Sequence, residues 1–123
     1  MEALAIFIGG GLGSLSRYGM SKWLGNTESG FPIGTLAANV AACIVLGMLA
    51  GLLLQRAQIP RAIQFGAMTG FCGGFSTFST FSSETFTLFE QGKTGLALLY
   101  IGLSLLLCVG GIFLGRYIGQ SVL

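Results

Sequence analysis

The chain has 123 residues, of which 53% are hydrophobic and only 8% are charged. A soluble domain typically carries about 25% charged residues, so this composition indicates a membrane protein. The sequence has no histidine and no aspartate, which removes most metal-ligand and acid–base chemistry. It also has no nucleophile–base pair, so we do not expect an enzyme. Because apolar segments use almost the whole chain, we expect a single transmembrane domain over 1–123.

Four segments are long enough to cross the hydrocarbon core, which takes about 20 mostly apolar residues. The second and fourth are free of charge over 33–54 and 95–115, and the third carries only Glu84. The first is interpreted as a retained helix rather than a signal peptide, since Glu2 is acidic and the apolar run continues past Arg17. We therefore predict an all-α membrane protein with transmembrane helices over 3–23, 33–54, 62–89 and 95–117.

The first predicted helix combines a glycine-rich stretch with a basic residue. Glycines at 9, 10, 11 and 13 allow close helix packing, which stabilises helix association in lipid. Arg17 lies near one end of the span, so its side chain either extends to the interface or faces a water-filled vestibule that attracts anions.

The second predicted helix carries Thr35 and Asn39 one turn apart on one face. An amide in the middle of a membrane helix needs hydrogen-bond partners. Asn39 therefore either forms a structural hydrogen bond between helices or serves as a donor along an ion pathway. Thr35 lies on the same face and is a candidate for the same pathway. Gly47 and Gly51 form a second predicted close-contact pair.

The third predicted helix is the most informative, because it is rich in hydroxyl groups and phenyl rings at membrane depth. Phenylalanines recur at 71, 75, 78 and 81 with serine or threonine at most positions between them. The Gly73-Gly74 pair predicts a break, which is tolerated in a membrane only against protein or a wet cavity. Phenyl rings at helical spacing often serve only to pack the core. Their electropositive edges, with hydroxyl donors, can also replace the water shell of a small anion, and the carbonyls of a break can hold a cation.

Polar residues also mark the end of the third helix and one face of the fourth. Glu84 is expected to pair with a basic group or line an exit, with a proton-coupling role as a weaker alternative. Tyr100, Ser104 and Cys108 recur at four-residue spacing and form one polar stripe, which serves either a pathway or packing. The three cysteines are odd in number and have no paired spacing, so they are interpreted as small buried apolar residues.

Basic residues are divided almost equally between the two sides of the membrane. Without a bias the positive-inside rule sets no orientation, so copies can insert both ways and pair as an antiparallel homodimer. The alternative is that charges are simply few. The residues on the two sides are Arg56, Arg61 and Arg116 against Lys22, Lys93 and the neighbouring Arg17.

Three motifs together resemble the Fluc (CrcB-type) fluoride channel family over essentially the full length. They are Gly10-Gly11-Leu12-Gly13 with Arg17-Tyr18, Gly34-Thr35-Leu36-Ala37-Ala38-Asn39, and the specific run from Gly70 to Ser82. The resemblance implies a passive fluoride-selective channel in a bacterial cytoplasmic (inner) membrane, which exports the ion and confers fluoride resistance. It also implies a dual-topology antiparallel homodimer with two pores and a central structural sodium ion.

The resemblance also implies roles for individual residues. Phe78 and Phe81 resemble the paired rings of the pores, Asn39 the pore amide, and Ser79 and Thr80 nearby hydroxyl donors. The main-chain carbonyls of Gly73 and Ser76 resemble the sodium ligands. Tyr100, Ser104 and Cys108 match a polar track, although the thiol at 108 is a weak donor where some members place a hydroxyl.

Two other functions are open from the residues alone. A small multidrug-type proton-coupled exporter is also a charge-balanced antiparallel dimer, but it needs a membrane-embedded carboxylate, for which only Glu84 is available. A non-transporting subunit of a membrane assembly would use the polar third helix to bind partner helices.

Overall fold

The structure is a computed structural model that describes residues 1–53 and 55–122, and within these residues it contains helices and no strand. Position 54, the predicted end of the second span, lies outside the described residues. The helices are α1 (Glu2–Leu24), α2 (Ile33–Leu53), α3 (Arg61–Phe65), the π-helix η1 (Gly66–Cys72), α4 (Gly73–Phe75), α5 (Phe78–Glu90) and α6 (Thr94–Ser121).

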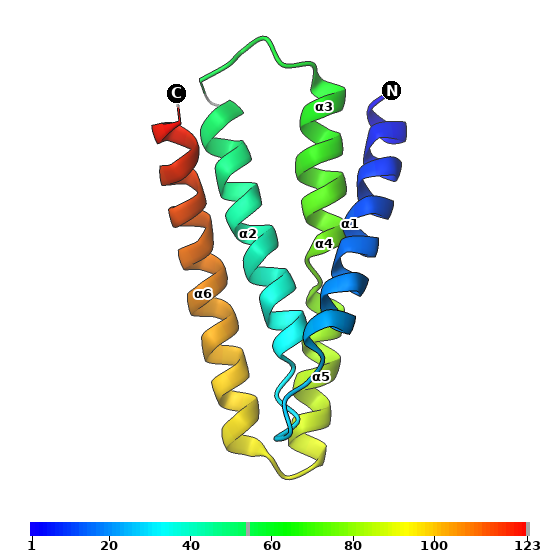
Figure 1. Ribbon diagram of the computed structural model, residues 1–123, viewed down its shortest axis with the longest axis vertical. Coiled ribbons are helices and arrows are strands. Elements are labelled where there is room, and N and C mark those ends of the chain that lie inside the picture. The colour runs from blue at the N-terminus through cyan, green and yellow to red at the C-terminus, as the bar shows by residue number, and fades with distance from the viewer. Residues whose placement is uncertain (54, 123) are drawn as a thin grey trace.

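The helices lie side by side along one long axis. Figure 1 shows both ends of the chain and the α2–α3 connector at one end of the bundle, and the α1–α2 and α5–α6 connectors at the other. The α3, η1 and α4 segments follow one another without a gap from Arg61 to Phe75 and form one rod, to which α5 adds the second half. The chain therefore traverses the bundle in alternating directions.

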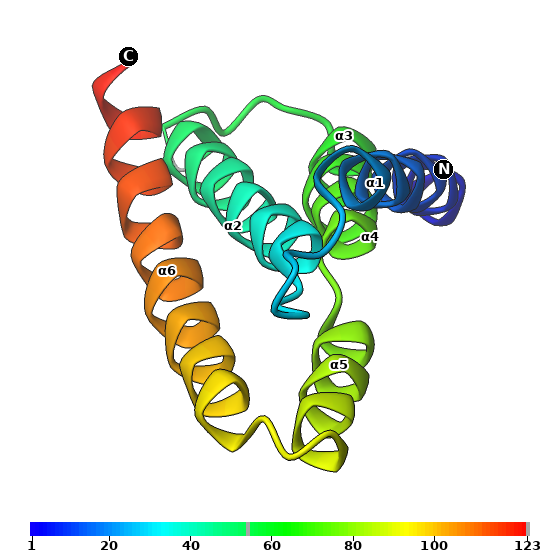
Figure 2. The same cartoon turned by 60° about the horizontal axis from the view of Figure 1, so that its bottom comes forward.

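Two helix pairs form the bundle. Figure 2 shows α1 beside the α3–η1–α4 rod and α2 beside α6, and these pairs make the most extensive contacts. Both pairs depend on glycine: a Cβ on Gly13 of α1 would overlap the Phe71 carbonyl oxygen, and one on Gly115 of α6 would overlap that of Ile44. Close backbone approach through small residues is how helices associate where lipid removes the hydrophobic driving force.

The break in the third rod lies at Ser76 and Thr77, just after the glycine pair near which the sequence predicted it. Gly73 is helical, with φ −64° and ψ −38°, whereas Ser76 and Thr77 are extended, with φ,ψ of −86°, 158° and −153°, 121°. The glycine pair itself is helical, and Gly74 serves close packing, as a Cβ there would overlap the Gly10 carbonyl oxygen of α1. The helix ends at Ser76 because interactions from elsewhere hold the Thr77 main chain.

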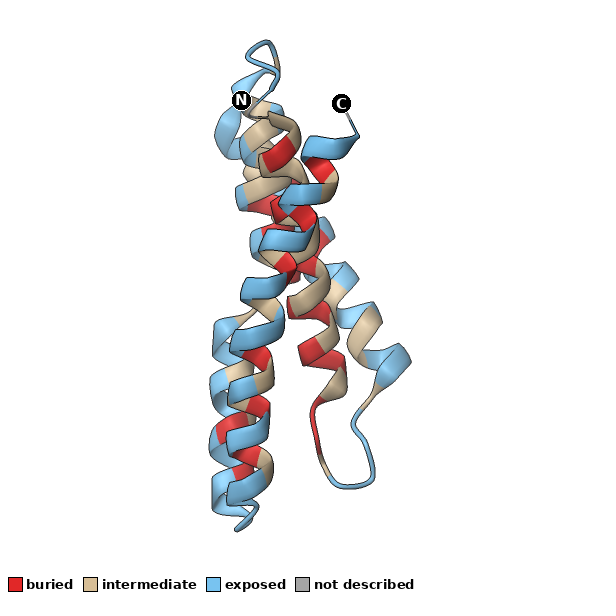
Figure 3. Ribbon diagram, turned by 90° about the vertical axis from the view of Figure 1, so that its left-hand side faces the viewer, coloured by how far each residue is buried: buried red, intermediate tan, exposed pale blue. Residues whose placement is uncertain are grey.

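Apolar side chains cover much of the outside of the bundle. Figure 3 shows buried residues concentrated where helices face one another and exposed residues along the outer faces. The helices α2 and α6 are each long and apolar enough to cross a membrane, with mean hydropathies of 2.3 and 2.4. Large exposed apolar residues on α1 and α6 include Phe7, Leu15, Leu106 and Phe113. Such a surface suits lipid or another apolar helix rather than water.

Candidate functional site

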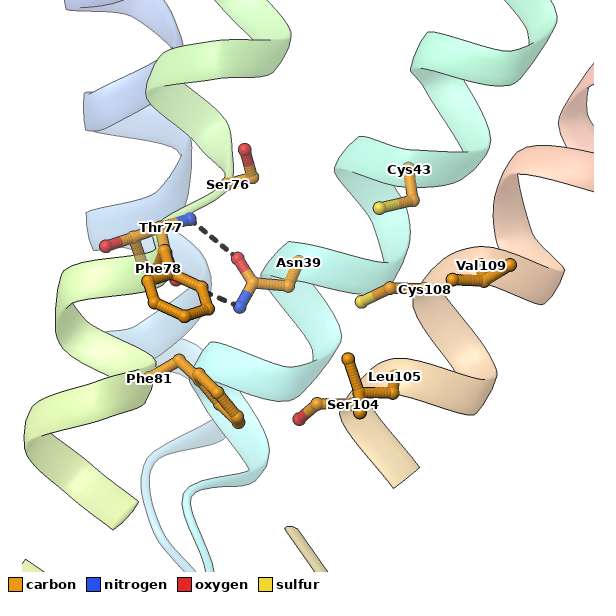
Figure 4. Close-up of a pocket in the computed structure, with 10 residues that line it drawn as sticks. All are labelled: Asn39, Cys43, Ser76, Thr77, Phe78, Phe81, Ser104, Leu105, Cys108 and Val109. Atoms are coloured by element: carbon orange, nitrogen blue, oxygen red, sulfur yellow. Dashed lines mark hydrogen bonds between the residues drawn. The ribbon is translucent and has the colours of Figure 1, made fainter. Parts of the chain in front are cut away.

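A cavity of about 230 Å³ lies where α2, α6 and the break in the third rod meet (Figure 4). Its lining contains hydroxyl, amide, thiol and phenyl groups but no charged side chain. Six of the residues proposed from the sequence line it, namely Asn39, Ser76, Phe78, Phe81, Ser104 and Cys108. The fold thus gathers residues from three helices around one space.

Asn39 holds the break in place. Its Nδ2 donates to the Thr77 carbonyl oxygen at 3.2 Å, and the Thr77 amide donates to its Oδ1 at 2.7 Å. Asn39 is only 9% exposed, so both bonds form away from bulk solvent. Of the two readings left open by the sequence, the structure shows the interhelical bond directly. The amide still borders the cavity, so a role toward an ion stays a prediction.

Thr77 also begins the second half of the broken rod. It is the N-cap of α5, and its hydroxyl accepts a hydrogen bond from the Thr80 amide at 3.2 Å. The Ser79 and Thr80 hydroxyls lie 3.3 and 3.2 Å from the same Thr77 oxygen. Ser79 and Thr80 are exposed and do not line the cavity in a single chain. Here they belong to the capping structure that fixes α5.

A row of aromatic rings runs from the cavity toward the α5–α6 end. Phe78 and Phe81 have ring centroids 5.7 Å apart, and Phe81 and Tyr100 have centroids 5.0 Å apart. Tyr100 then meets Phe31 edge-on at 5.5 Å. All three pairs are tilted or edge-to-face, which presents electropositive ring edges beside electronegative faces.

The polar stripe of α6 divides into groups with different partners. Tyr100 is fully buried, and its hydroxyl donates to Glu84 Oε1 at 3.1 Å. Ser104 is 6% exposed, and its hydroxyl has no hydrogen-bond partner among the described residues. Cys108 borders the cavity one turn further. An unpartnered buried hydroxyl is available to a bound solute or water.

Glu84 connects this stripe to the end of the bundle. It lines a second cavity of about 230 Å³ together with Asn26, Glu28 and Lys93. Thr35 is buried on α2 and adjoins the Glu84–Tyr100 pair rather than the central cavity. Glu84 therefore bonds to a phenol and borders this cavity, and it makes no ion pair among the described residues. Its role at an exit stays a prediction.

The main chain just before the break has carbonyl groups without helical donors. A helix end leaves its last carbonyls unpaired, and here the Thr77 amide, the normal donor to Gly73, bonds to Asn39 instead. The Ser76 hydroxyl turns back to donate to the Cys72 carbonyl at 2.9 Å. Gly73 and Ser76 together line a small adjoining cavity of about 110 Å³.

Arg17 lies apart from the central cavity. It is half-buried on α1, one turn beyond the buried Gly13 that packs against Phe71. It is not among the residues that line the central cavity. Its vestibule role stays a prediction.

Four lining residues of the central cavity were not predicted from the sequence, namely Cys43, Thr77, Leu105 and Val109, of which the first two are polar. Cys43 lines it, and its position one turn after Asn39 on α2 was a usable signal. Thr77 binds Asn39 through its main chain and caps α5, and a threonine followed by a polar helical run is a recognisable helix start. Thr35, Tyr100 and Gly73 lie outside the cavity.

The chain is similar to known proteins over nearly its whole length. The sequence model of a family described as CrcB-like protein, Camphor Resistance (CrcB), matches residues 4–116. A protein of Paracoccus denitrificans (strain Pd 1222) named "Fluoride-specific ion channel FluC" is 39% identical over 119 residues, covering 97% of this chain and 94% of its own length.

Two further relatives carry similar names. The "Fluoride-specific ion channel FluC" of Nitrobacter winogradskyi is 43% identical, covering 97% of this chain and 95% of the relative. The "Fluoride-specific ion channel FluC 2" of Bacillus subtilis (strain 168) is 44% identical, covering 96% of this chain and 87% of the relative.

Proposed function

This chain belongs to the CrcB-like protein family, and from that premise we propose that it is a passive ion channel selective for fluoride. Relatives that align with nearly its whole length are named for that activity. The structural observation that carries the proposal is the central cavity. It combines the Phe78 and Phe81 rings with the unpartnered Ser104 hydroxyl and has no charged side chain in its lining.

This chemistry suits a small, strongly hydrated anion. Ring edges and a hydroxyl donor can replace part of the water shell of fluoride as it enters the cavity. A full positive charge in the lining would hold the anion too tightly, because conduction requires binding that is favourable yet easily reversed. Neutral donors meet both conditions. We therefore assign the pathway to the cavity and the aromatic row that leads from it past Tyr100.

The chemistry of fluoride explains why a passive channel protects a cell. Neutral HF crosses a bilayer, dissociates at neutral pH and leaves fluoride inside. An inside-negative potential favours anion exit by about 2.3 kcal/mol per charge per 100 mV. A channel in a bacterial cytoplasmic membrane therefore exports fluoride without an energy source of its own.

We propose that the channel works as an antiparallel homodimer. Phe78 is 78% exposed and Ser79 and Thr80 are also exposed, although a pathway ring must be shielded to replace water around an ion. A second copy covering this face would complete the lining. The near-equal division of basic residues between the two ends of the bundle supports insertion of copies in both orientations.

The break also fits a sodium ion at the centre of such a dimer. Main-chain oxygens are suitable ligands for a hard monovalent cation, and carbonyls at a broken helix perform this role in transporters. The Gly73 and Ser76 carbonyls, released from helical bonding by the break, would hold the ion. When bound, sodium would supply a fixed positive charge that joins the two carbonyl sets.

The function is tested by ion efflux from liposomes that contain the purified protein. Fluoride-loaded and chloride-loaded vesicles are compared with potassium and valinomycin setting the potential, and protein-free vesicles give the leak. We expect rapid fluoride release and no chloride release above the leak. Absence of fluoride release from a monodisperse dimer would overturn the proposal. The same vesicles would then be assayed for proton-coupled export of a cationic drug, with Glu84→Gln as the diagnostic variant.

A further inference from the structure

The central cavity contains a pair of thiols from two different helices. Cys43 of α2 and Cys108 of α6 both line it, and Figure 4 shows both sulfurs directed from their helices into the same space. Both side chains are partly exposed, so a solute in the cavity can reach them.

The helix packing fixes this arrangement. The α2–α6 interface is the most extensive in the bundle, and α6 approaches Cys43 closely through Gly111, where an added Cβ would lie 3.5 Å from the Cys43 Cβ. Glycine one turn further, at Gly115, brings the backbones together. The thiols are thus held by rigid helices rather than by loops, which favours a site with defined geometry.

We propose that Cys43 and Cys108 form a two-thiolate binding site for a soft divalent cation, of which Hg²⁺ is the best match. Thiolates select soft metal ions, and Hg²⁺ accepts two of them in a linear arrangement. Binding releases both S–H protons to water, forms two S–Hg bonds and changes no oxidation state. This inference is independent of the proposed function, because it concerns metal binding alone.

Charge and ligand number distinguish Hg²⁺ from other thiophilic ions. Two thiolates neutralise a divalent ion, whereas with Ag⁺ or Cu⁺ they leave the site with a net charge of −1. Such a net charge is unfavourable at membrane depth in a cavity that has no charged side chain in its lining. Zinc is divalent but is almost always bound by four ligands in structural sites. The described residues provide no cluster of three or more His, Cys, Asp or Glu side chains.

The third cysteine provides a matched control. Cys72 is buried on η1 and lines the smaller cavity beside Gly73 rather than the central one. Cys43 also reaches that smaller cavity, so a Cys43–Cys72 pair is the competing arrangement. Replacing Cys72 or Cys108 separately therefore distinguishes the two pairs.

The experiment measures mercury that the purified full-length protein retains after one equivalent of HgCl₂, a glutathione challenge and desalting. We expect one mercury per chain in the wild type and in Cys72→Ala. Loss of a residue that only supports a metal ligand weakens metal binding by about 10–100-fold, and loss of a ligand itself should weaken it at least as much. Cys43→Ser and Cys108→Ser should therefore release the ion at glutathione concentrations at least about 100-fold lower than the wild type does. Retention by Cys108→Ser, or loss from Cys72→Ala, would overturn the assignment.

A second measurement uses the wild type only, so it does not depend on how well the variants fold. The protein is treated with a maleimide under denaturing conditions, with and without bound Hg²⁺, and the labelled peptides are counted by mass spectrometry. Mercury should protect Cys43 and Cys108 together and leave Cys72 labelled. Protection of a single cysteine, or of the Cys43–Cys72 pair, would refute the proposal.

Discussion

Replacing Asn39 by leucine tests the interaction that positions the break in the third rod. Leucine has a similar volume but cannot form the bonds of 2.7 and 3.2 Å that join Asn39 to the Thr77 amide and carbonyl. Both groups of Thr77 would then lack their interhelical partner, at a position where the asparagine is 9% exposed. The expected effect is loss of stability together with displacement of the α5 rings.

The magnitude follows from the groups left unpaired. A buried donor or acceptor without a partner costs about 1–3 kcal/mol, whereas hydrogen bonds within membrane helices are worth about 0.6 kcal/mol on average and at most about 1.7. The Thr77 amide loses the one partner that it has among the described residues, and the carbonyl loses one of two possible bonds. We therefore expect Asn39→Leu to lower the free energy of unfolding by about 2–4 kcal/mol.

The assay is denaturation of the purified protein by SDS, followed by circular dichroism, with fluoride efflux measured on the same preparations. Gln120→Leu is the matched control, because Gln120 is exposed at the end of α6 and surface changes are usually within about 0.5 kcal/mol. We expect the Asn39 variant to lose at least about tenfold in flux, equivalent to about 1.4 kcal/mol. Wild-type stability in Asn39→Leu would refute the structural argument, and wild-type flux would refute its link to the pathway.

Further predictions concern packing, the aromatic row, the polar stripe and the metal site. Gly115→Ala should reduce the yield and thermal stability of the purified protein, because the added Cβ would overlap a backbone carbonyl. Gly110→Ala is the control: Gly110 has open space around it, so this change should be neutral or stabilising by up to about 1 kcal/mol. Phe81→Ile should decrease fluoride efflux while the size-exclusion profile stays that of the wild type, and unchanged flux would argue against the role of the rings. Tyr100→Phe removes the bond to Glu84 and should lower stability by about 0.6–1.7 kcal/mol, the range for a hydrogen bond within membrane helices. No change would indicate that this bond is dispensable. If the channel function is correct, one equivalent of Hg²⁺ should inhibit efflux in liposomes and excess dithiothreitol should restore it; inhibition that persists in the single serine variants would place the effect elsewhere.

The helices and several site residues could be predicted because their signals are local. Apolar runs of the right length predicted helices close to where the structure has them, for example 3–23 against Glu2–Leu24. Asn39 and Ser104 could be identified because a polar group within an apolar helix needs an explanation wherever the helix packs. The same local reasoning placed the break near Gly73-Gly74 but not at its residues, Ser76 and Thr77, since glycine serves close packing as readily as a break. Only the contact between Gly74 and the Gly10 carbonyl shows which use applies.

The sequence by itself determined the class of protein, the order of its helices and its family, because these depend on composition, on the spacing of residues along the chain and on motifs within single helices. Tertiary structure decided where the third rod breaks, because the Asn39–Thr77 bonds join residues 38 positions apart. It also decided that the Ser104 hydroxyl has no partner among the described residues and that Cys43 and Cys108 share a cavity. No spacing in the sequence encodes these outcomes, since each depends on which helix faces which when the backbones come into contact.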